Sequence, residues 1–225
     1  MRIGSTCRTD SWACEFGSSK VAAAYPTLPA ALGDFRPPSI YRYDLRTRTL
    51  LDKTPPDPRI AVTLGMRSAG RFGNVVILGG PAMPSGINLF AFRTDTGQYL
   101  GSTNLPYSNI RKWATIDGAM YLGVGNPDGS GGVLRWRGDA ASPFQFEVVG
   151  ITGSEVAELT EHEGRVFVST WPTASVPAGV YMSPPIPAGG LTSADAGTWE
   201  NVWLATDYDP DPVTAAELAS CGGEE

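Results

Sequence analysis

The chain has 225 residues and a formal net charge of −6, with 18% charged and 42% hydrophobic residues. Nucleic-acid binding requires basic surface to neutralise phosphates, so this acidic balance excludes nucleic acid as a partner. No stretch approaches the roughly 18 apolar residues of a membrane helix, and no membrane span is expected. The 27 glycines and 19 prolines, in a chain this hydrophobic, indicate many short strands joined by turns rather than disorder.

A glycine that precedes a short β-rich run recurs along the chain, at spacings of 56, 45, 46 and 59 residues. A small residue stands four positions before each of these glycines. The glycines are Gly17, Gly73, Gly118, Gly164 and Gly223, and the small residues are Ala13, Ala69, Ala114, Thr160 and Ala219. Repeats of this length with several strands each are typical of β-propeller blades.

Taken in chain order, each repeat contains four runs that are rich in Val, Ile, Tyr, Phe and Trp and separated by turn residues. The first blade, residues 8–55, contains SWACEFG, KVAAAYP, SIYRYDL and TLLDKTP. The second, residues 62–105, contains GMRSAGRFG, NVVILGGP, INLFAFRTDTG and QYLGSTNL. The third, residues 107–150, contains IRKWATIDG, AMYLGVG, GVLRWRGD and FQFEVVG. The fourth, residues 153–206, contains EVAELTEHEG, RVFVSTWP, AGVYMSPP and TWENVWLA.

The second run of each blade is nearly all apolar, which predicts a strand covered on both faces by neighbouring blades. The third run instead carries an arginine among its apolar residues, Arg42 in the first blade and Arg135 in the third. This alternation predicts a strand nearer to solvent. The expected fold is all-β: one β-propeller domain over residues 1–225, with four four-stranded blades plus the start of a fifth.

The incomplete fifth blade is predicted from residue 213, where Glu217-Leu218-Ala219 aligns with Glu158-Leu159-Thr160. An unpaired strand edge invites a partner. We therefore expect a protein partner, or the remainder of a longer propeller, at the open blade edge. The pattern favours a truncated product of a longer propeller over a four-bladed unit with an atypical tail.

Two segments resemble known propeller repeats. Val75 to Gly80, VVILGG, looks like part of a kelch blade. Ser193-Ala194-Asp195-Ala196-Gly197-Thr198-Trp199 resembles the Asp-box of sialidase-like propellers, although it is one residue short before the tryptophan and follows a proline-rich insertion. The resemblance implies a structural role, in which the serine and aspartate brace the turn between the third and fourth strands and the tryptophan packs between blades.

The position six residues before each repeat glycine is charged in most blades, and the first strand of a propeller blade lines the central channel. The channel candidates are Arg67, Lys112 and Glu158, with Ser11 and Glu217 at the equivalent positions of the first and fifth repeats. Converging charges of both signs can bind a ligand or a metal, or pair with one another around trapped water. The sequence alone does not distinguish binding of a ligand or metal from pairing among these charges.

Asp207, Asp209 and Asp211 form an alternating carboxylate run in a proline-rich segment. Oxygen ligands of this kind suit Ca²⁺. Pro212 replaces the glycine that an EF-hand requires, so the alternative is a solvated acidic loop. No cofactor is otherwise expected.

The remaining signals for catalysis are sparse. His162 is the only histidine, and the chain contains no G-x-S-x-G nucleophile elbow. Among the six tryptophans, Trp113 is expected in the core between blades and Trp171 in an exposed loop.

The leading hypothesis is therefore a non-enzymatic binding or scaffold module of an exported or surface-associated bacterial protein. An extracellular or periplasmic location is favoured even though the first residues show no apolar leader. The alternative is a glycoside hydrolase or lactonase-like hydrolase with its site at the propeller channel.

Overall fold

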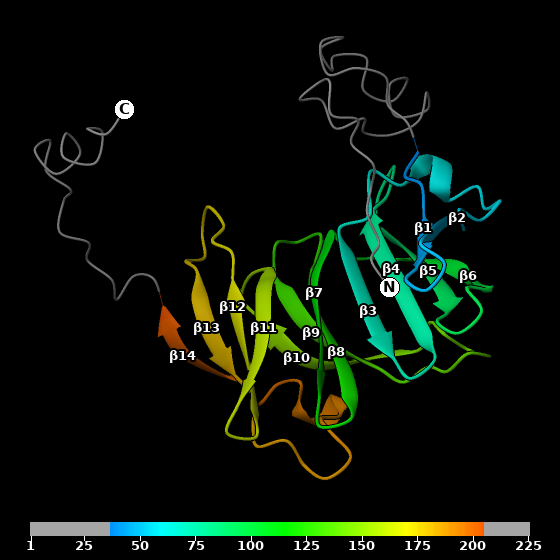
Figure 1. Ribbon diagram of the computed structural model, residues 1–225. Coiled ribbons are helices and arrows are strands. Elements are labelled where there is room, and N and C mark those ends of the chain that lie inside the picture. Colours follow the sequence, from blue (N-terminus) through cyan, green and yellow to red (C-terminus); the bar gives the residue numbers. More distant parts are fainter. Residues whose placement is uncertain (1–36, 205–225) are drawn as a thin grey trace, which may run out of the picture.

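The computed structural model describes residues 37–204, and these residues form antiparallel β-sheets (Figure 1). One four-stranded sheet consists of β3 (Ser68–Phe72), β4 (Val75–Pro81), β5 (Ile87–Arg93) and β6 (Tyr99–Leu105). The next consists of β7 (Asn109–Ile116), β8 (Ala119–Gly125), β9 (Gly131–Trp136) and β10 (Phe146–Thr152). The last consists of β11 (Val156–His162), β12 (Arg165–Thr170), β13 (Gly179–Met182) and β14 (Glu200–Leu204). We call these sheets blades two, three and four.

Before blade two, β1 (Tyr41–Asp44) and β2 (Thr49–Asp52) form a hairpin. This hairpin matches the last two strands expected for blade one. The earlier part of blade one lies outside the described residues, and so does the expected start of a fifth blade from residue 213. The helical elements of the described region are two single 3₁₀ turns, η2 (Ile60–Val62) and η3 (Ser193–Asp195). Within residues 37–204, no helix is long and apolar enough to cross a membrane.

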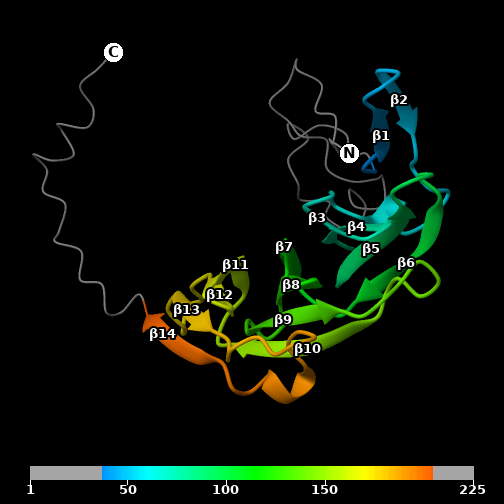
Figure 2. The ribbon, with the colours of Figure 1, turned by 60° about the horizontal axis from the view of Figure 1, so that its bottom comes forward.

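Each blade is a meander whose strands follow one another in chain order, and the blades stand side by side along an arc (Figure 2). The first strands β3, β7 and β11 lie on the inside of the arc, and β6, β10 and β14 lie on the outside. Contacts of β3 with β7 and of β7 with β11 join the blades. This arrangement is propeller-like, but the described sheets do not close into a ring, so they leave the number of blades open.

The repeat glycines occupy the tight turns between the first and second strands. Gly73, Gly118 and Gly164 all have positive φ angles, of 55°, 71° and 69°. Two-residue hairpins between right-twisted strands need such angles, which glycine adopts without steric cost. The recurring glycine therefore reflects turn geometry.

The turn between the first and second strands of blade two is nevertheless built differently. The predicted alignment of this blade with blades three and four is therefore shifted by one residue. Gly73 is the first turn residue after β3, whereas Gly118 and Gly164 are the second turn residues after β7 and β11. Consequently Gly70, rather than Ala69, is equivalent to Ala114 and Thr160. The three small repeat residues within the described region, Ala69, Ala114 and Thr160, do lie on first strands. The predicted equivalence of Ala69 with the other two is wrong by one residue.

The second strands are buried as predicted in blades two and three, where β4 and β8 are covered on both faces. In blade four, β12 alternates between buried and half-buried residues. Its buried residues Val166 and Val168 face blade three. Described residues cover only that face, and this difference explains the alternation.

The prediction for Arg135 is wrong, because this side chain is buried, at 8% exposure. The segment between β13 and β14 folds back over blade three and covers it. Arg135 Nη1 donates to the Leu191 carbonyl oxygen at 2.7 Å, and Nη2 donates to that of Gly189. The Leu191 amide in turn donates to the Tyr121 hydroxyl at 3.0 Å. A long-range segment, not the strand's own pattern, therefore excludes solvent here.

The same segment ends in a turn that ties blade four to blade three. Asp195 Oδ2 accepts hydrogen bonds from the Thr192 amide at 2.8 Å and the Thr192 hydroxyl at 3.0 Å. Trp199 Nε1 donates to the carbonyl oxygen of Val149 in β10 at 2.7 Å. The tryptophan thus packs between the two blades, and the aspartate braces the turn.

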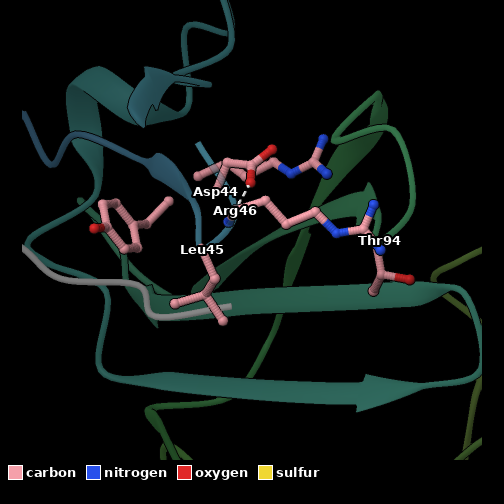
Figure 3. Close-up of a pocket in the computed structure, with 6 residues that line it drawn as sticks. Asp44, Leu45, Arg46 and Thr94 are labelled. Carbon is pink, nitrogen blue, oxygen red and sulfur yellow. Dashed lines mark hydrogen bonds between the residues drawn. The ribbon is translucent and has the colours of Figure 1, made fainter. Parts of the chain in front are cut away.

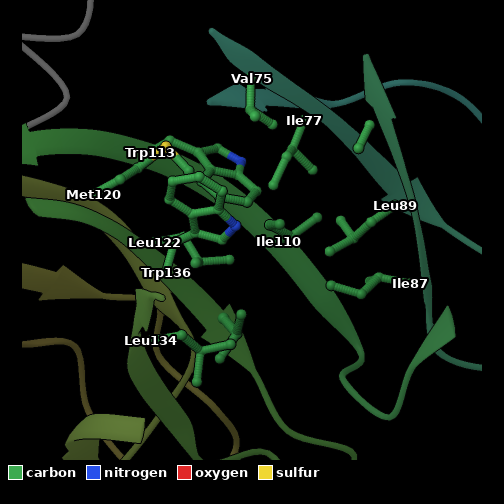
Figure 4. Packing of buried hydrophobic residues seen from close by; sticks show 12 residues of the cluster. Val75, Ile77, Ile87, Leu89, Ile110, Trp113, Met120, Leu122, Leu134 and Trp136 are labelled. Carbon is green, nitrogen blue, oxygen red and sulfur yellow. The ribbon is translucent and has the colours of Figure 1, made fainter. Parts of the chain in front are cut away.

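The main apolar core lies between blades two and three (Figure 4). Trp113 and Trp136 reach into it together with aliphatic side chains of β4, β5, β8 and β9. A second cluster joins blades three and four, and a third joins blade two to Ile40 beside the β1–β2 hairpin. Because the cores lie between sheets, each blade depends on its neighbour for burial.

Candidate functional site

A pocket of about 510 Å³ opens where the inner strands of blades two, three and four approach one another. Its lining residues are Arg67, Ile110, Arg111, Ala157, Glu158 and Trp171. We call this pocket, with the neighbouring Lys112 and Glu155, the channel-side site. Arg67 precedes β3, Arg111 and Lys112 belong to β7, and Glu158 belongs to β11, so three successive blades contribute.

Irregular pairing of the inner strands explains why two adjacent residues of β7, Arg111 and Lys112, are both exposed at the channel-side site. The pairing of β7 with β8 shifts between Ile110 and Trp113, and that of β11 with β12 shifts between Val156 and Glu158. A bulge breaks the alternation of side chains and re-aims them. Arg111 and Lys112 are consequently both exposed, whereas a regular strand would send one of them into the core.

Two of the three predicted channel residues pair with each other. Lys112 Nζ lies 3.1 Å from Glu158 Oε2, and both side chains are largely exposed. Exposed pairs of this kind contribute about 0–1 kcal/mol to stability. The third predicted residue, Arg67, lines the same pocket. Its amide donates to the Gly79 carbonyl oxygen at 2.9 Å, but its side chain makes no hydrogen bond or ion pair with any residue in 37–204. The structure therefore brings the predicted residues together and leaves one guanidinium unpaired within that region.

A second set of contacts, which the sequence did not reveal, centres on Glu155. Glu155 Oε1 accepts a hydrogen bond from Asn109 Nδ2 at 2.6 Å and forms an ion pair with Arg111 Nε at 3.0 Å. The Arg111 guanidinium carbon lies 5.2 Å from the centre of the Trp171 ring. Cation–π contacts at such sites contribute about 0.5–1 kcal/mol. Arg111 is thus held between a carboxylate and an aromatic face.

Trp171 follows β12 and is 49% exposed, in agreement with its predicted exposure. Its amide donates to the Glu155 carbonyl oxygen at 2.9 Å, which anchors the loop to the start of blade four. Glu155 does not stand at the repeat position that predicted Arg67, Lys112 and Glu158. Only its ion pair with Arg111 in the structure identifies it as part of the site. Within the part of the chain that the structure describes, the site offers one guanidinium without a side-chain partner, one aromatic ring and two carboxylates that already have cationic partners.

A smaller pocket of about 310 Å³ lies at the β1–β2 hairpin (Figure 3). Arg42, Asp44 and Arg46 of the hairpin line it together with Thr94. Asp44 Oδ1 accepts hydrogen bonds from the Arg46 amide at 2.8 Å and the Thr47 amide at 3.2 Å. The Thr47 contact and the Arg46 contact lower the pKa of Asp44. This carboxylate is used to close the turn and is therefore not free to bind a ligand.

The remaining candidates from the sequence are the carboxylate run suited to Ca²⁺ and the single histidine. Asp207, Asp209 and Asp211 lie outside the described residues. Among residues 37–204, no cluster of three His, Cys, Asp or Glu side chains could hold a metal ion. His162 is 71% exposed, and its nearest carboxylate is that of the adjacent Glu163, at 3.7 Å. This environment has none of the buried partners that a catalytic histidine uses.

No family model and no curated protein matches the chain. Among solved structures, the computationally designed Ika4 protein matches 51% of this chain and 64% of its own, with 17% identity and a TM-score of 0.35. The computationally designed Ika8 protein matches 51% of this chain and 32% of its own, with 16% identity and a TM-score of 0.34. An alpha-L-arabinofuranosidase from Clostridium thermocellum matches 80% of this chain and 66% of its own, with 14% identity and a TM-score of 0.42.

This chain spans less than two thirds of each of these three proteins. At such TM-scores the likeness supports no conclusion about a site or an activity. The fold assignment rests instead on the observed sheets: an all-β, propeller-like array of antiparallel blades.

Proposed function

We propose that this protein is a non-enzymatic binding module of β-propeller type and that the channel-side site is where it binds a ligand. The observation that carries the proposal is the convergence of charged side chains from three successive blades around Trp171. Binding pockets characteristically combine apolar or aromatic surface with a few converging polar groups.

The arrangement also indicates the chemistry of the ligand. Lys112–Glu158 and Arg111–Glu155 are paired in the absence of any ligand, so these contacts preorganise the walls. Arg67 supplies the guanidinium that pairs with no other described residue, and guanidinium groups match carboxylates in a two-pronged geometry. We therefore expect a small polar ligand that carries a carboxylate and presents a flat face to Trp171.

A glycoside hydrolase or lactonase-like hydrolase would need a carboxylate free to exchange a proton with its substrate. Both carboxylates of the channel-side site are engaged: Glu158 with Lys112, and Glu155 with Asn109 and Arg111. This engagement favours binding over hydrolysis. We also propose that the fourth blade is of the Asp-box type, given the braced turn at Asp195 and the packing of Trp199, and that the module belongs to a larger exported or surface-associated assembly.

The proposal is tested by isothermal titration calorimetry with a panel of neutral sugars, the matching uronic acids and citrate. We expect binding of a carboxylate-bearing compound that weakens at least about tenfold, or 1.4 kcal/mol, in Arg67→Gln and in Trp171→Ala. Arg93→Gln is the matched control, because Arg93 forms a surface ion pair with Asp95 away from the site.

Equal binding by all three variants would reject the channel-side site. Turnover of chromogenic glycosides or lactones that is lost in Glu155→Gln would reject the non-enzymatic role and favour the hydrolase.

A further inference from the structure

Blades two and three each present a glycine to the next blade at the same position of the second strand. The fifth residue of the second strand is a glycine, Gly79 in β4 and Gly123 in β8, on the face turned toward the following blade. A Cβ at Gly79 would lie 3.5 Å from Ile110 Cδ1, and one at Gly123 would lie 2.8 Å from Val156 Cβ. We call this surface of a blade its forward face. At Gly123 the missing side chain makes room for Val156 of the following inner strand. At Gly79 the close contact of an added Cβ would be with Leu89 Cδ2 of the same sheet, at 2.6 Å, and Ile110 would lie at ordinary contact distance.

The inserted residues are themselves equivalent. Ile110 stands eight positions before Gly118, and Val156 stands eight positions before Gly164. Both are fully buried. A second backward-facing residue follows at the position five before the glycine, Trp113 in β7 and Leu159 in β11, and it is also buried.

The forward face of blade four differs in two respects. Its fifth second-strand residue is Ser169, in β12, where the other blades have glycine. Phe167, the third residue of β12, is half-buried, although its equivalents Ile77 and Tyr121 are fully buried. Trp203, which pairs with Val180 across β13 and β14, is 43% exposed. No described residue therefore covers this face, which lies at one end of the arc (Figure 2).

The sequence of this chain contains a segment that complements the change. Counted from Gly223 as from the earlier repeat glycines, the inserted position is Ala215 and the second backward-facing position is Leu218. Ser169 stands where blade three has Gly123, and at the position that faces it the small alanine Ala215 takes the place of Val156. Close packing favours such compensation, because extra volume at a filled contact destabilises the fold.

The length of chain also suffices. Blade two is connected to blade three by only three residues, 106–108. Eight residues, 205–212, separate the end of β14 from residue 213. Extended chain spans up to about 3.3–3.6 Å per residue, so this connection can reach from the outer strand to the inside of the arc.

We propose that residues 213–220 bind along the forward face of blade four as the inner strand of a further blade, with Ala215 over Ser169 and Leu218 against the apolar side chains around Phe167. The occupant of this face is thus the chain's own C-terminal segment. The inference is independent of the ligand proposed for the channel-side site.

Cysteine cross-linking tests the contact in the full chain. Cys7, Cys14 and Cys221 are first replaced by serine, and Ser169→Cys is combined with Ala215→Cys. Disulfides require Cβ atoms about 3.5–4.5 Å apart, which the Gly123–Val156 geometry approaches and a small adjustment of the strands provides. Under mild oxidation we expect a monomer that loses two hydrogen atoms and yields a linked 169–215 peptide on mass spectrometry.

The matched control combines Ser169→Cys with Ala219→Cys, because Ala219 is equivalent to the exposed Thr160, which does not face the preceding blade. This pair should not link. A second readout avoids cross-linking: Leu218→Asp should lower the melting temperature, and Ala219→Asp should not.

A disulfide-linked dimer from Ser169→Cys with Ala215→Cys would overturn the proposal in favour of a second copy on this face. Two free thiols in that variant, or equal melting temperatures for the two aspartate variants, would overturn it as well.

Discussion

The packing of blade two against blade three makes a quantitative prediction about Gly70 and Trp113. A Cβ added at Gly70 would lie 2.5 Å from Trp113 Cδ2 and 2.9 Å from Cγ, closer than two carbon atoms approach. Trp113 is 9% exposed, and its Nε1 donates to the buried Ser68 hydroxyl. The indole ring therefore has no room to retreat from an added methyl group. Gly70→Ala should cost about 1–3 kcal/mol through overpacking.

Trp113→Ala should cost about 3–5 kcal/mol, the range for removing a large buried aromatic side chain. It also leaves a cavity beside Gly70. In that background the methyl group of Gly70→Ala enters empty space, and reduced freedom of the unfolded chain makes the substitution neutral or stabilising by up to about 1 kcal/mol. The two substitutions together should thus be less destabilising than the sum of the separate effects, by about 1–3 kcal/mol or more.

The assay is urea unfolding of the wild type, both single variants and the double variant, followed by far-ultraviolet circular dichroism. Gly197→Ala is the control, because a Cβ there would meet no atom within 4 Å and the residue does not have a positive φ. It should be neutral in both backgrounds. If Gly70→Ala costs the same with and without Trp113, to within about 0.5 kcal/mol, the proposed contact between the two residues is wrong.

Three further predictions concern other parts of the chain. Arg135→Ala should cost roughly 2–4 kcal/mol, since hydrogen bonds from a buried cation are lost, and should expose the segment around Leu191 to chymotrypsin. Arg93→Ala, at a surface ion pair, should cost much less than Arg135→Ala, and equal effects of the two variants would contradict the buried role of Arg135. Burial and the hydrogen bond to Asp57 raise the pKa of Tyr99 from 10.0 to about 12, so the folded state holds this proton more tightly than the unfolded chain. Stability should therefore fall as the pH rises from about 10 to about 12, and a pH profile with the same slope in Tyr99→Phe would refute this assignment. EDTA should leave the melting temperature unchanged, because the run Asp207, Asp209 and Asp211 lacks the turn glycine of a calcium loop; restoration of a lowered melting temperature by Ca²⁺ would assign a metal to it.

Local pattern alone predicted the elements of this protein. Alternation and apolar runs report which faces of a strand are covered, and β4 and β8 are buried as their composition indicates. The repeat glycines mark tight turns, because few other residues adopt positive φ at low cost. The recurring position of Trp113 predicted its burial, and the proline-rich surroundings of Trp171 predicted its exposure. Each of these properties depends on residues within a few positions of one another.

Only the tertiary structure decided the contacts between blades. Lys112 meets Glu158, and Arg111 meets Glu155, across 46 and 44 positions of the chain. The bulge in β7 that exposes both Arg111 and Lys112 is invisible to a period of two, and so is the shifted turn at Gly73. Arg135 has the spacing of a solvent-facing residue and is buried because a segment more than 50 positions away covers it. Sequence spacing specifies strands and turns because they form from neighbouring residues. The site depends on how separate sheets stack, and that is determined by packing between residues far apart in the chain.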